Sequence, residues 1–174
     1  MSELNVIKDA TNKTLTIERV FPAPRARLWA AWSDPEKLAQ WWGPRGWATT
    51  ILTFEFKPGG VWHYCMKCED KEQGEFYGQE SWGKAIFQTI NEPASLSYQD
   101  NFSDAAGTLN EAMPSMAITV EFVEQGDATK LVSRTVFESQ EDYDRVVAMG
   151  VVEGLTQTWN RLEELVTQEG VLPR

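Results

Sequence analysis

Histidine and cysteine are nearly absent from this chain, which contains one histidine and two cysteines among 174 residues. All three lie in the stretch VWHYCMKC, as His63, Cys65 and Cys68, and this stretch has the composition of a β-strand. Residues i and i+3 of a strand point to opposite faces, and a zinc site usually needs four ligands. We therefore expect two reduced structural thiols and an ordinarily hydrogen-bonded histidine rather than a metal or redox site, and no cofactor.

Clusters of basic residues and long apolar runs are also missing. The chain has 16 Lys and Arg against 26 Asp and Glu, a formal charge of −10, and no Lys/Arg run that would attract a phosphate backbone. No apolar stretch approaches the roughly 20 residues that span a bilayer, and MSELNVIKDA lacks the basic and apolar regions of a signal peptide. We expect a single cytoplasmic domain over residues 1–174, with no nucleic-acid partner and no membrane span.

The first third of the sequence predicts a hairpin and two short helices. Residues 4–8 and 14–20 flank a polar turn, so residues 1–13 form either an N-terminal extension or a first hairpin strand. Pro24 suits the first turn of one helix, and Pro35 that of a second. Ser33 and Glu36 have the spacing of a capping box for the second helix, with Asp34 as a competing cap.

The remaining sequence predicts strands followed by a helix. Strands are expected at 48–56, 61–68, 76–90, 94–102, 115–124 and 129–137, with bends or bulges at Gly78 and Gly83. A charged loop precedes the third of these strands, and residues 103–114 form a loop long enough to be a rim or a lid. Apolar residues recur every three or four positions through 139–166, which predicts one long helix that ends before Gly170. A curved antiparallel sheet closed by this helix would leave space for a small molecule.

Several stretches resemble the START/SRPBCC helix-grip superfamily: FPAPRARLWAAWSDPEKLAQWWGPRGW, KPGGVWHYCM, INEPASL and GVVEGLTQTWNRLEELV. They are most similar to the branch related to the C-terminal domain of the activator of the large heat-shock ATPase chaperone, as in uncharacterised bacterial Aha1-like members. The resemblance implies an α+β fold with a curved antiparallel sheet of about six or seven strands, two short helices, and a long C-terminal helix over a cavity. Relatives often carry an aromatic residue where Leu155 follows Gly154 here, so the resemblance identifies no ligand.

Tryptophan is concentrated in the helix pair and the loop that follows it. Five of the eight tryptophans lie there, at positions 29, 32, 41, 42 and 47. Packing in the core is the favoured interpretation, and a contribution to a pocket or to a protein-docking surface stays open. Neighbouring helix residues point about 100° apart, so we expect one of Trp41 and Trp42 to be buried and the other partly exposed.

The alternation of residues within the strands and the helix predicts which side chains line the cavity. Trp62, Tyr64 and Met66 share one strand face. The other candidates are Trp42, Met116, Ile118, Val120, Phe122, Val151, Leu155, Thr158 and Trp159. The alternative is that these side chains simply fill the core and leave no cavity.

No residue pattern argues for catalysis. Glu55, Glu80, Arg134 and Glu153 are polar groups that could converge on the cavity, but no phosphate loop, nucleophile elbow or metal cluster is present. We therefore favour non-enzymatic binding of an apolar or aromatic small molecule. A chaperone-associated interaction module and a cyclase- or hydrolase-type enzyme are the alternatives, and a homodimer stays open.

Overall fold

One antiparallel sheet organises the protein in the computed structural model, which describes residues 3–171 and the side chains of residues 3–168. Within this part of the chain the strands are β1 (Asn5–Asp9), β2 (Thr14–Phe21), β3 (Trp47–Phe54), β4 (Val61–Cys68), β5 (Glu80–Asn91), β6 (Ser95–Phe102), β7 (Ser115–Gln125) and β8 (Ala128–Phe137). They are hydrogen-bonded in the order β1-β2-β8-β7-β6-β5-β4-β3. The α+β class is confirmed; the sheet has eight strands, rather than six or seven, because residues 5–9 pair with β2 and add an edge strand.

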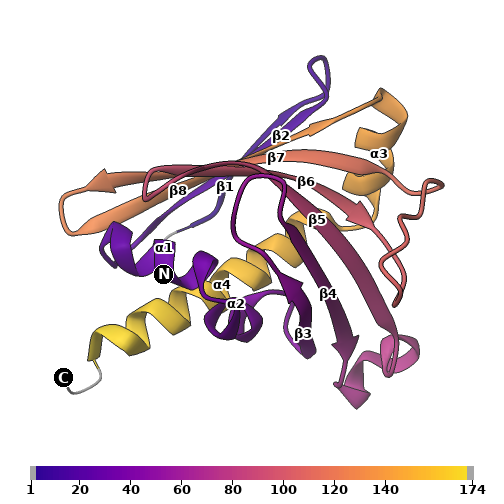
Figure 1. The fold of residues 1–174 in the computed structure, drawn as a ribbon, viewed down its shortest axis with the longest axis horizontal. Helices are drawn as coiled ribbons and strands as arrows, with labels where there is room; N and C mark the ends of the chain where they lie inside the picture. The colour runs from indigo at the N-terminus through magenta and orange to yellow at the C-terminus, as the bar shows by residue number, and fades with distance from the viewer. Residues whose placement is uncertain (1–2, 172–174) are drawn as a thin grey trace.

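Some helices lie inside the curve of the sheet and others at its ends (Figure 1). They are α1 (Arg25–Ser33), α2 (Pro35–Trp41), the short 3-10 helix η1 (Lys71–Phe76), α3 (Gln140–Ala148) and α4 (Val151–Val171). The sheet bends around α4, with α1 and α2 beside this helix and α3 near the opposite end of the sheet (Figure 1). Register shifts between Ile51 and Thr53 in β3 and between Phe87 and Thr89 in β5 add local bends to the strands.

Local capping explains where the two short helices begin. Pro24 is the N-cap of α1, and Pro35 occupies the first turn of α2. The carboxylate of Asp34 accepts a hydrogen bond from the backbone N–H of Glu36 at 3.0 Å. Asp34 is therefore the cap of α2, and the capping box from Ser33 is wrong: Ser33 still belongs to α1.

The long C-terminal helix predicted from the periodicity is in fact two helices. The break falls at Met149 and Gly150, where Gly150 has φ +83°, a left-handed conformation that ends α3. The apolar period continues across this break, which is why the sequence pattern did not reveal it. Helix α4 extends to Val171 and includes Gly170, which was expected beyond its end.

Three smaller expectations are also corrected. The charged loop contains the 3-10 helix η1, β5 begins after Gly78, and its bulge lies between Phe87 and Thr89 rather than at a glycine. Residues 109–113 of the loop at 103–114 line a separate depression of about 240 Å³. Residues 104–107 of this loop pack on the convex face of the sheet. There the ring of His63 hydrogen-bonds to the carbonyl of Asp104 at 2.9 Å, the ordinary contact expected of this histidine, and the ammonium of Lys84 to the carbonyl of Gly107 at 3.1 Å.

An aromatic core joins α1, α2 and the sheet. Trp29, Trp32 and Trp41 are buried, and the indole N–H of Trp41 donates to the carbonyl of Ala31 at 3.0 Å. Trp41 is fully buried and Trp42 is partly exposed, as expected from their angular separation. Each buried tryptophan removes about 150–250 Å² from water, so this end of the protein is densely packed.

The guanidinium of Arg161 on α4 holds the loop that follows α2. It donates to the backbone carbonyls of Gln40, Gly43, Pro44 and Trp47, at distances from 2.7 to 3.3 Å. The bond to Gln40 satisfies a carbonyl in the last turn of α2, which lacks an intrahelical partner, and the other three satisfy carbonyls of the loop and of the first residue of β3. Arg161 thereby fixes the loop against α4, and with it the side chain of Trp42.

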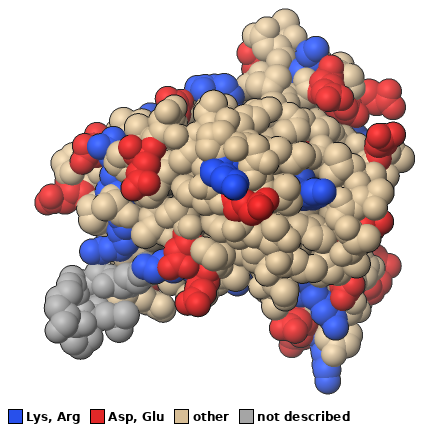
Figure 2. Space-filling view, in the orientation of Figure 1, with Lys and Arg blue, Asp and Glu red and all other residues tan. Residues whose placement is uncertain are grey.

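Charged side chains of both signs are interspersed on the face shown in Figure 2, with basic residues lying singly or in small groups. Along the described part of the chain, none of the helices has both the length and the apolar character needed to cross a bilayer.

Candidate functional site

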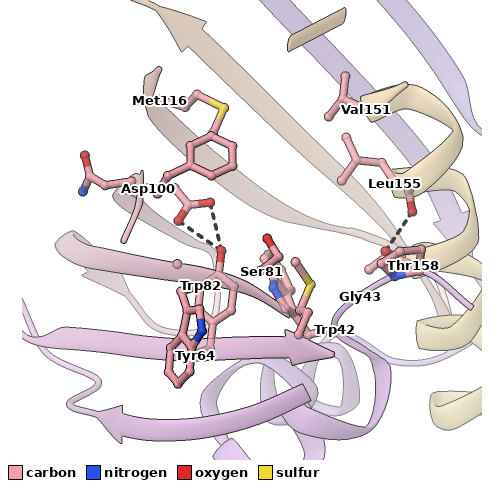
Figure 3. A pocket seen from close by; sticks show the side chains of 16 residues that line it. Trp42, Gly43, Tyr64, Ser81, Trp82, Asp100, Met116, Val151, Leu155 and Thr158 are labelled. Carbon is pink, nitrogen blue, oxygen red and sulfur yellow. Dashed lines mark hydrogen bonds between the residues drawn. The ribbon is translucent and has the colours of Figure 1, made fainter. Parts of the chain in front are cut away.

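A pocket of about 230 Å³ lies between α4 and the sheet strands β4, β5 and β6. Its lining consists of Trp42, Gly43, Pro44, Tyr64, Met66, Ser81, Trp82, Gly83, Asp100, Asn101, Phe102, Met116, Val151, Gly154, Leu155 and Thr158. We call it the α4 pocket (Figure 3). Most of these side chains are apolar or aromatic, and a few polar groups are set among them, the composition typical of a small-molecule site.

A glycine on α4 faces open space in the pocket. Gly154 lines the pocket, and a Cβ added to it would meet no atom within 4 Å. Val151 and Thr158, which lie about one turn before and after Gly154, also line the pocket. The first turns of α4 therefore form one wall of the pocket, opposite the sheet. Thr158 donates its hydroxyl to the carbonyl of Gly154 at 2.8 Å, which satisfies its polar group within the helix.

Asp100 and Tyr64 form a buried polar pair in the wall of the pocket. The Tyr64 hydroxyl lies 3.2 and 3.4 Å from the two carboxylate oxygens of Asp100 and donates to them (Figure 3). Asp100 is 9% exposed and Tyr64 is 6% exposed. The pair comes from two strands that both neighbour β5: Tyr64 is opposite Gly83, and Asp100 is opposite Ala85.

The absence of a side chain at Gly83 is what admits the tyrosine. A Cβ at this position would lie 2.3 Å from Cζ of Tyr64 and 2.4 Å from its hydroxyl oxygen. Real Cβ atoms do not approach other atoms so closely, so any larger residue would displace the ring. Gly83 therefore positions the hydroxyl that donates to Asp100.

Burial changes the acidity of both members of the pair. Removal from water raises the pKa of Asp100 from its ordinary value of 3.8 to about 7, and the hydrogen bond from Tyr64 opposes this rise. Burial, and then the charge of Asp100, raise the pKa of Tyr64 well above 10. Tyr64 therefore remains a hydrogen-bond donor at neutral pH, whereas the Asp100 carboxyl changes its charge near neutral pH.

Seven of the side chains predicted to line a cavity lie around the α4 pocket: Trp42, Tyr64, Met66, Met116, Val151, Leu155 and Thr158. The other five do not line it. Trp62, Val120, Phe122 and Trp159 are almost completely buried in the aromatic core, and Ile118 packs against that core. These five side chains point to the concave side of the sheet, as expected from the alternation, but α1 and α2 fill the space next to them.

Sequence reasoning missed the polar side of the pocket. Asp100 was not singled out, although Leu96, Tyr98 and Asp100 alternate along β6 and the first two are buried. The polar groups that were considered for catalysis, Glu55, Glu80, Arg134 and Glu153, are exposed, and none of them lines the pocket. The signal that could have identified Asp100 is a carboxylate in phase with the apolar positions of a strand.

A wider depression of about 650 Å³ lies beside α2, but its polar groups already serve the fold. Arg161 holds loop carbonyls, Arg45 pairs with Glu164, and Asp70 caps η1. Cys65 and Cys68 are free and buried on β4, and no group of three or more metal-ligating side chains occurs within the described residues. The α4 pocket is therefore the better candidate for a ligand site.

Comparison with known proteins places the chain among related bacterial proteins. Residues 22–167 match the family described as Activator of Hsp90 ATPase homolog 1-like protein. A solution structure of an Arthrobacter aurescens protein is 30% identical, with a TM-score of 0.85 and coverage of 94% of this chain and 91% of that one. A crystal structure of a Mycobacterium smegmatis protein is 28% identical, with a TM-score of 0.84 and coverage of 95% and 97%. A comparison with curated proteins finds no significant match.

Proposed function

The chain belongs to the activator of Hsp90 ATPase homolog 1-like family, and we propose that it binds a small, mainly apolar aromatic molecule in the α4 pocket without converting it chemically. The observation that carries this proposal is the open space in front of Gly154, on the one helix that faces the concave side of the sheet at this point. A cleft with mainly apolar walls and a few polar groups is the usual form of a small-molecule site.

The size of the α4 pocket limits the ligand. Cavities of about 150 Å³ with apolar walls hold benzene, and sites for drug-sized ligands occupy about 300–1,000 Å³. A pocket of about 230 Å³ lies between these values. We therefore expect a ligand with one substituted ring or two fused rings rather than a sterol or a long-chain lipid.

The nature of the walls supports an aromatic ligand. Trp42, Tyr64 and Phe102 present ring surfaces, and the thioethers of Met66 and Met116 add polarisable contacts. The indole of Trp42 also provides a signal, because a bound aromatic molecule in contact with it will change its fluorescence.

Thermal unfolding with indole as the first probe tests this proposal. Saturation at about 100 times Kd adds about 2.7 kcal/mol to the free energy of unfolding, which raises Tm by roughly 5–10 °C for a chain of this size. Gly154→Phe should fill the pocket and abolish the shift, whereas the matched control Gly154→Ala should retain it. A library of small aromatic compounds that shifts wild type and Gly154→Phe equally, or shifts neither, would overturn the proposal.

The family name supplies a second candidate, a contact with the large heat-shock ATPase chaperone. This contact requires no occupied pocket. A pull-down with the chaperone, done with wild type and with Gly154→Phe, separates the two functions. If the chaperone binds both proteins, the contact with the chaperone does not depend on the pocket. Failure of wild type to form a salt-resistant complex would remove this candidate.

A further inference from the structure

Asp100 is a buried acid without a cationic partner. Within the described residues, no lysine, arginine or histidine forms an ion pair with it; its partners are the Tyr64 hydroxyl and the backbone N–H of Asn101. The other buried acid of the concave side, Glu163, is by contrast paired with Arg19 at 2.8 Å. Buried charges in proteins are normally paired, so the missing cation at Asp100 needs an explanation.

The elements around Asp100 contribute few groups that titrate. Tyr64 of β4 and Tyr98 of β6 face it, and burial, followed by the charge of Asp100, raises the pKa of both. From β5, β7 and α4 the facing residues are uncharged: Gly83, Ala85, Met116, Val151, Leu155 and Thr158. Lys84 is directed to the convex face, where it donates to the carbonyl of Gly107. A ligand in the pocket therefore meets Asp100 as the nearest ionisable acid, with no competing base.

We propose that the α4 pocket selects small aromatic amines, and that the Asp100 carboxylate binds their protonated nitrogen. This inference rests on the proposed binding function and names the class of ligand. The aromatic part of such a molecule contacts the rings and thioethers of the pocket, and the ammonium replaces the missing counter-charge. Tyr64 is a positioning residue, because its hydroxyl holds the carboxylate on one side.

The walls of the pocket favour a cation in a second way. The rings of Trp42 and Tyr64 are electron-rich, and a desolvated cation near such a ring gains additional attraction. The net charge of −10 also raises the local concentration of cations around the protein. A ligand with a carboxylate or phosphate group would be repelled by the Asp100 carboxylate and would meet no basic side chain in the pocket lining.

Calorimetric titration with three matched probes tests the assignment: 2-phenylethylamine, 2-phenylethanol and phenylacetate. At pH 8 the amine should bind at least tenfold more tightly than the neutral alcohol, and phenylacetate should bind most weakly. Between pH 8 and pH 5.5 the affinity for the amine should fall by about 30-fold, because the ionised fraction of an acid with a pKa of about 7 falls by this factor. The affinity for the alcohol should not follow this dependence.

Asp100→Asn is the decisive variant, since it keeps the shape of the side chain and removes the charge. It should reduce amine affinity at pH 8 at least tenfold, abolish the pH dependence, and leave binding of the alcohol within threefold. In wild type labelled with ¹³C at aspartate carboxyls, saturation with the amine should lower the pKa of Asp100, and saturation with the alcohol should not.

Two contrary results have different meanings. Equal affinities for amine and alcohol, tighter binding of phenylacetate, or undiminished amine binding by Asp100→Asn would overturn the amine assignment and leave the binding function intact. Absence of binding by these three probes and by indole would overturn the binding function, and the amine assignment with it.

Discussion

At the scale of single residues, Asp100 is where stability and binding conflict. A neutral or apolar residue at this buried position would avoid the cost of desolvating a carboxylate. The alternation along β6 places Asp100 on the same face as Leu96 and Tyr98, both buried. A carboxylate kept in such an environment stabilises the fold less than it could, which is typical of residues with a binding role.

Replacement of Asp100 by asparagine should stabilise the protein in a pH-dependent manner. Between about pH 4 and pH 7 the folded protein holds more protons at this site than the unfolded chain, so the free energy of unfolding of wild type falls as pH rises. Asparagine has no ionised form. By pH 8 the variant should be more stable than wild type by up to about 4 kcal/mol, and the difference should vanish near pH 4.

Urea unfolding at pH 4, 6 and 8 measures this difference. The exposed Asp127 in the β7–β8 turn gives a matched control, because Asp127→Asn should change stability by less than about 0.5 kcal/mol at each pH. A constant difference between Asp100→Asn and wild type across this range would contradict the raised pKa of Asp100.

At the scale of elements, two glycines four residues apart have opposite roles. Gly150 has a positive φ and ends α3, whereas Gly154 lies inside α4 with open space around it. Gly150→Ala should lower the free energy of unfolding by about 1 kcal/mol, because L-residues are strained in the left-handed region. Gly154→Ala should raise it by about 0.5–1 kcal/mol through helix propensity. Chemical unfolding measures both changes. Stabilisation by both substitutions would contradict this account, because it is the result expected if one helix ran continuously through Gly150.

The clamp by Arg161 should govern the order of the loop over residues 43–47. Arg161→Met removes the donor to four backbone carbonyls and should cost about 2–3 kcal/mol, a value typical of hydrogen bonds to a charged group at a partly buried site. Amide exchange in the loop should accelerate. The control Arg134→Met removes an exposed arginine with a weak pair to Glu121 and should cost less than about 1 kcal/mol. Equal losses in the two variants would show that the clamp contributes nothing.

Element prediction from the sequence succeeded where a local signal exists. Alternating residues and proline-marked helix starts predicted β4, β6 and the α1–α2 pair closely. The break before α4 was missed because the apolar period runs through Gly150 without interruption. The Arg161 clamp was missed because its acceptors are backbone carbonyls more than a hundred residues away, and no side-chain pattern reports them.

At the scale of the whole molecule, the concave side of the sheet has a filled end and an open end. Helices α1 and α2 insert Trp29, Trp32 and Trp41 into one end, where the second half of α4 contributes Trp159 and Leu162. At the other end, Val151, Gly154 and Leu155 of α4 face the pocket. The sequence predicts which side chains of each strand point to the concave side. The boundary between the packed core and the pocket depends instead on how far α1 and α2 extend along the sheet. This is why Trp62 and Phe122 lie in the packed core rather than around the α4 pocket.

The central claim, a ligand site under the first turns of α4, can be tested within one spectrum of the protein with ¹³C-labelled methionine methyl groups. Met66 and Met116 line the pocket, whereas Met149 is 56% exposed outside it. Titration with indole should shift the methyl signals of Met66 and Met116 in a saturable manner, leave Met149 unchanged, and have no effect on Met66 and Met116 in Gly154→Phe. Shifts confined to Met149, or equal at all three, would place binding on the surface and contradict the claim.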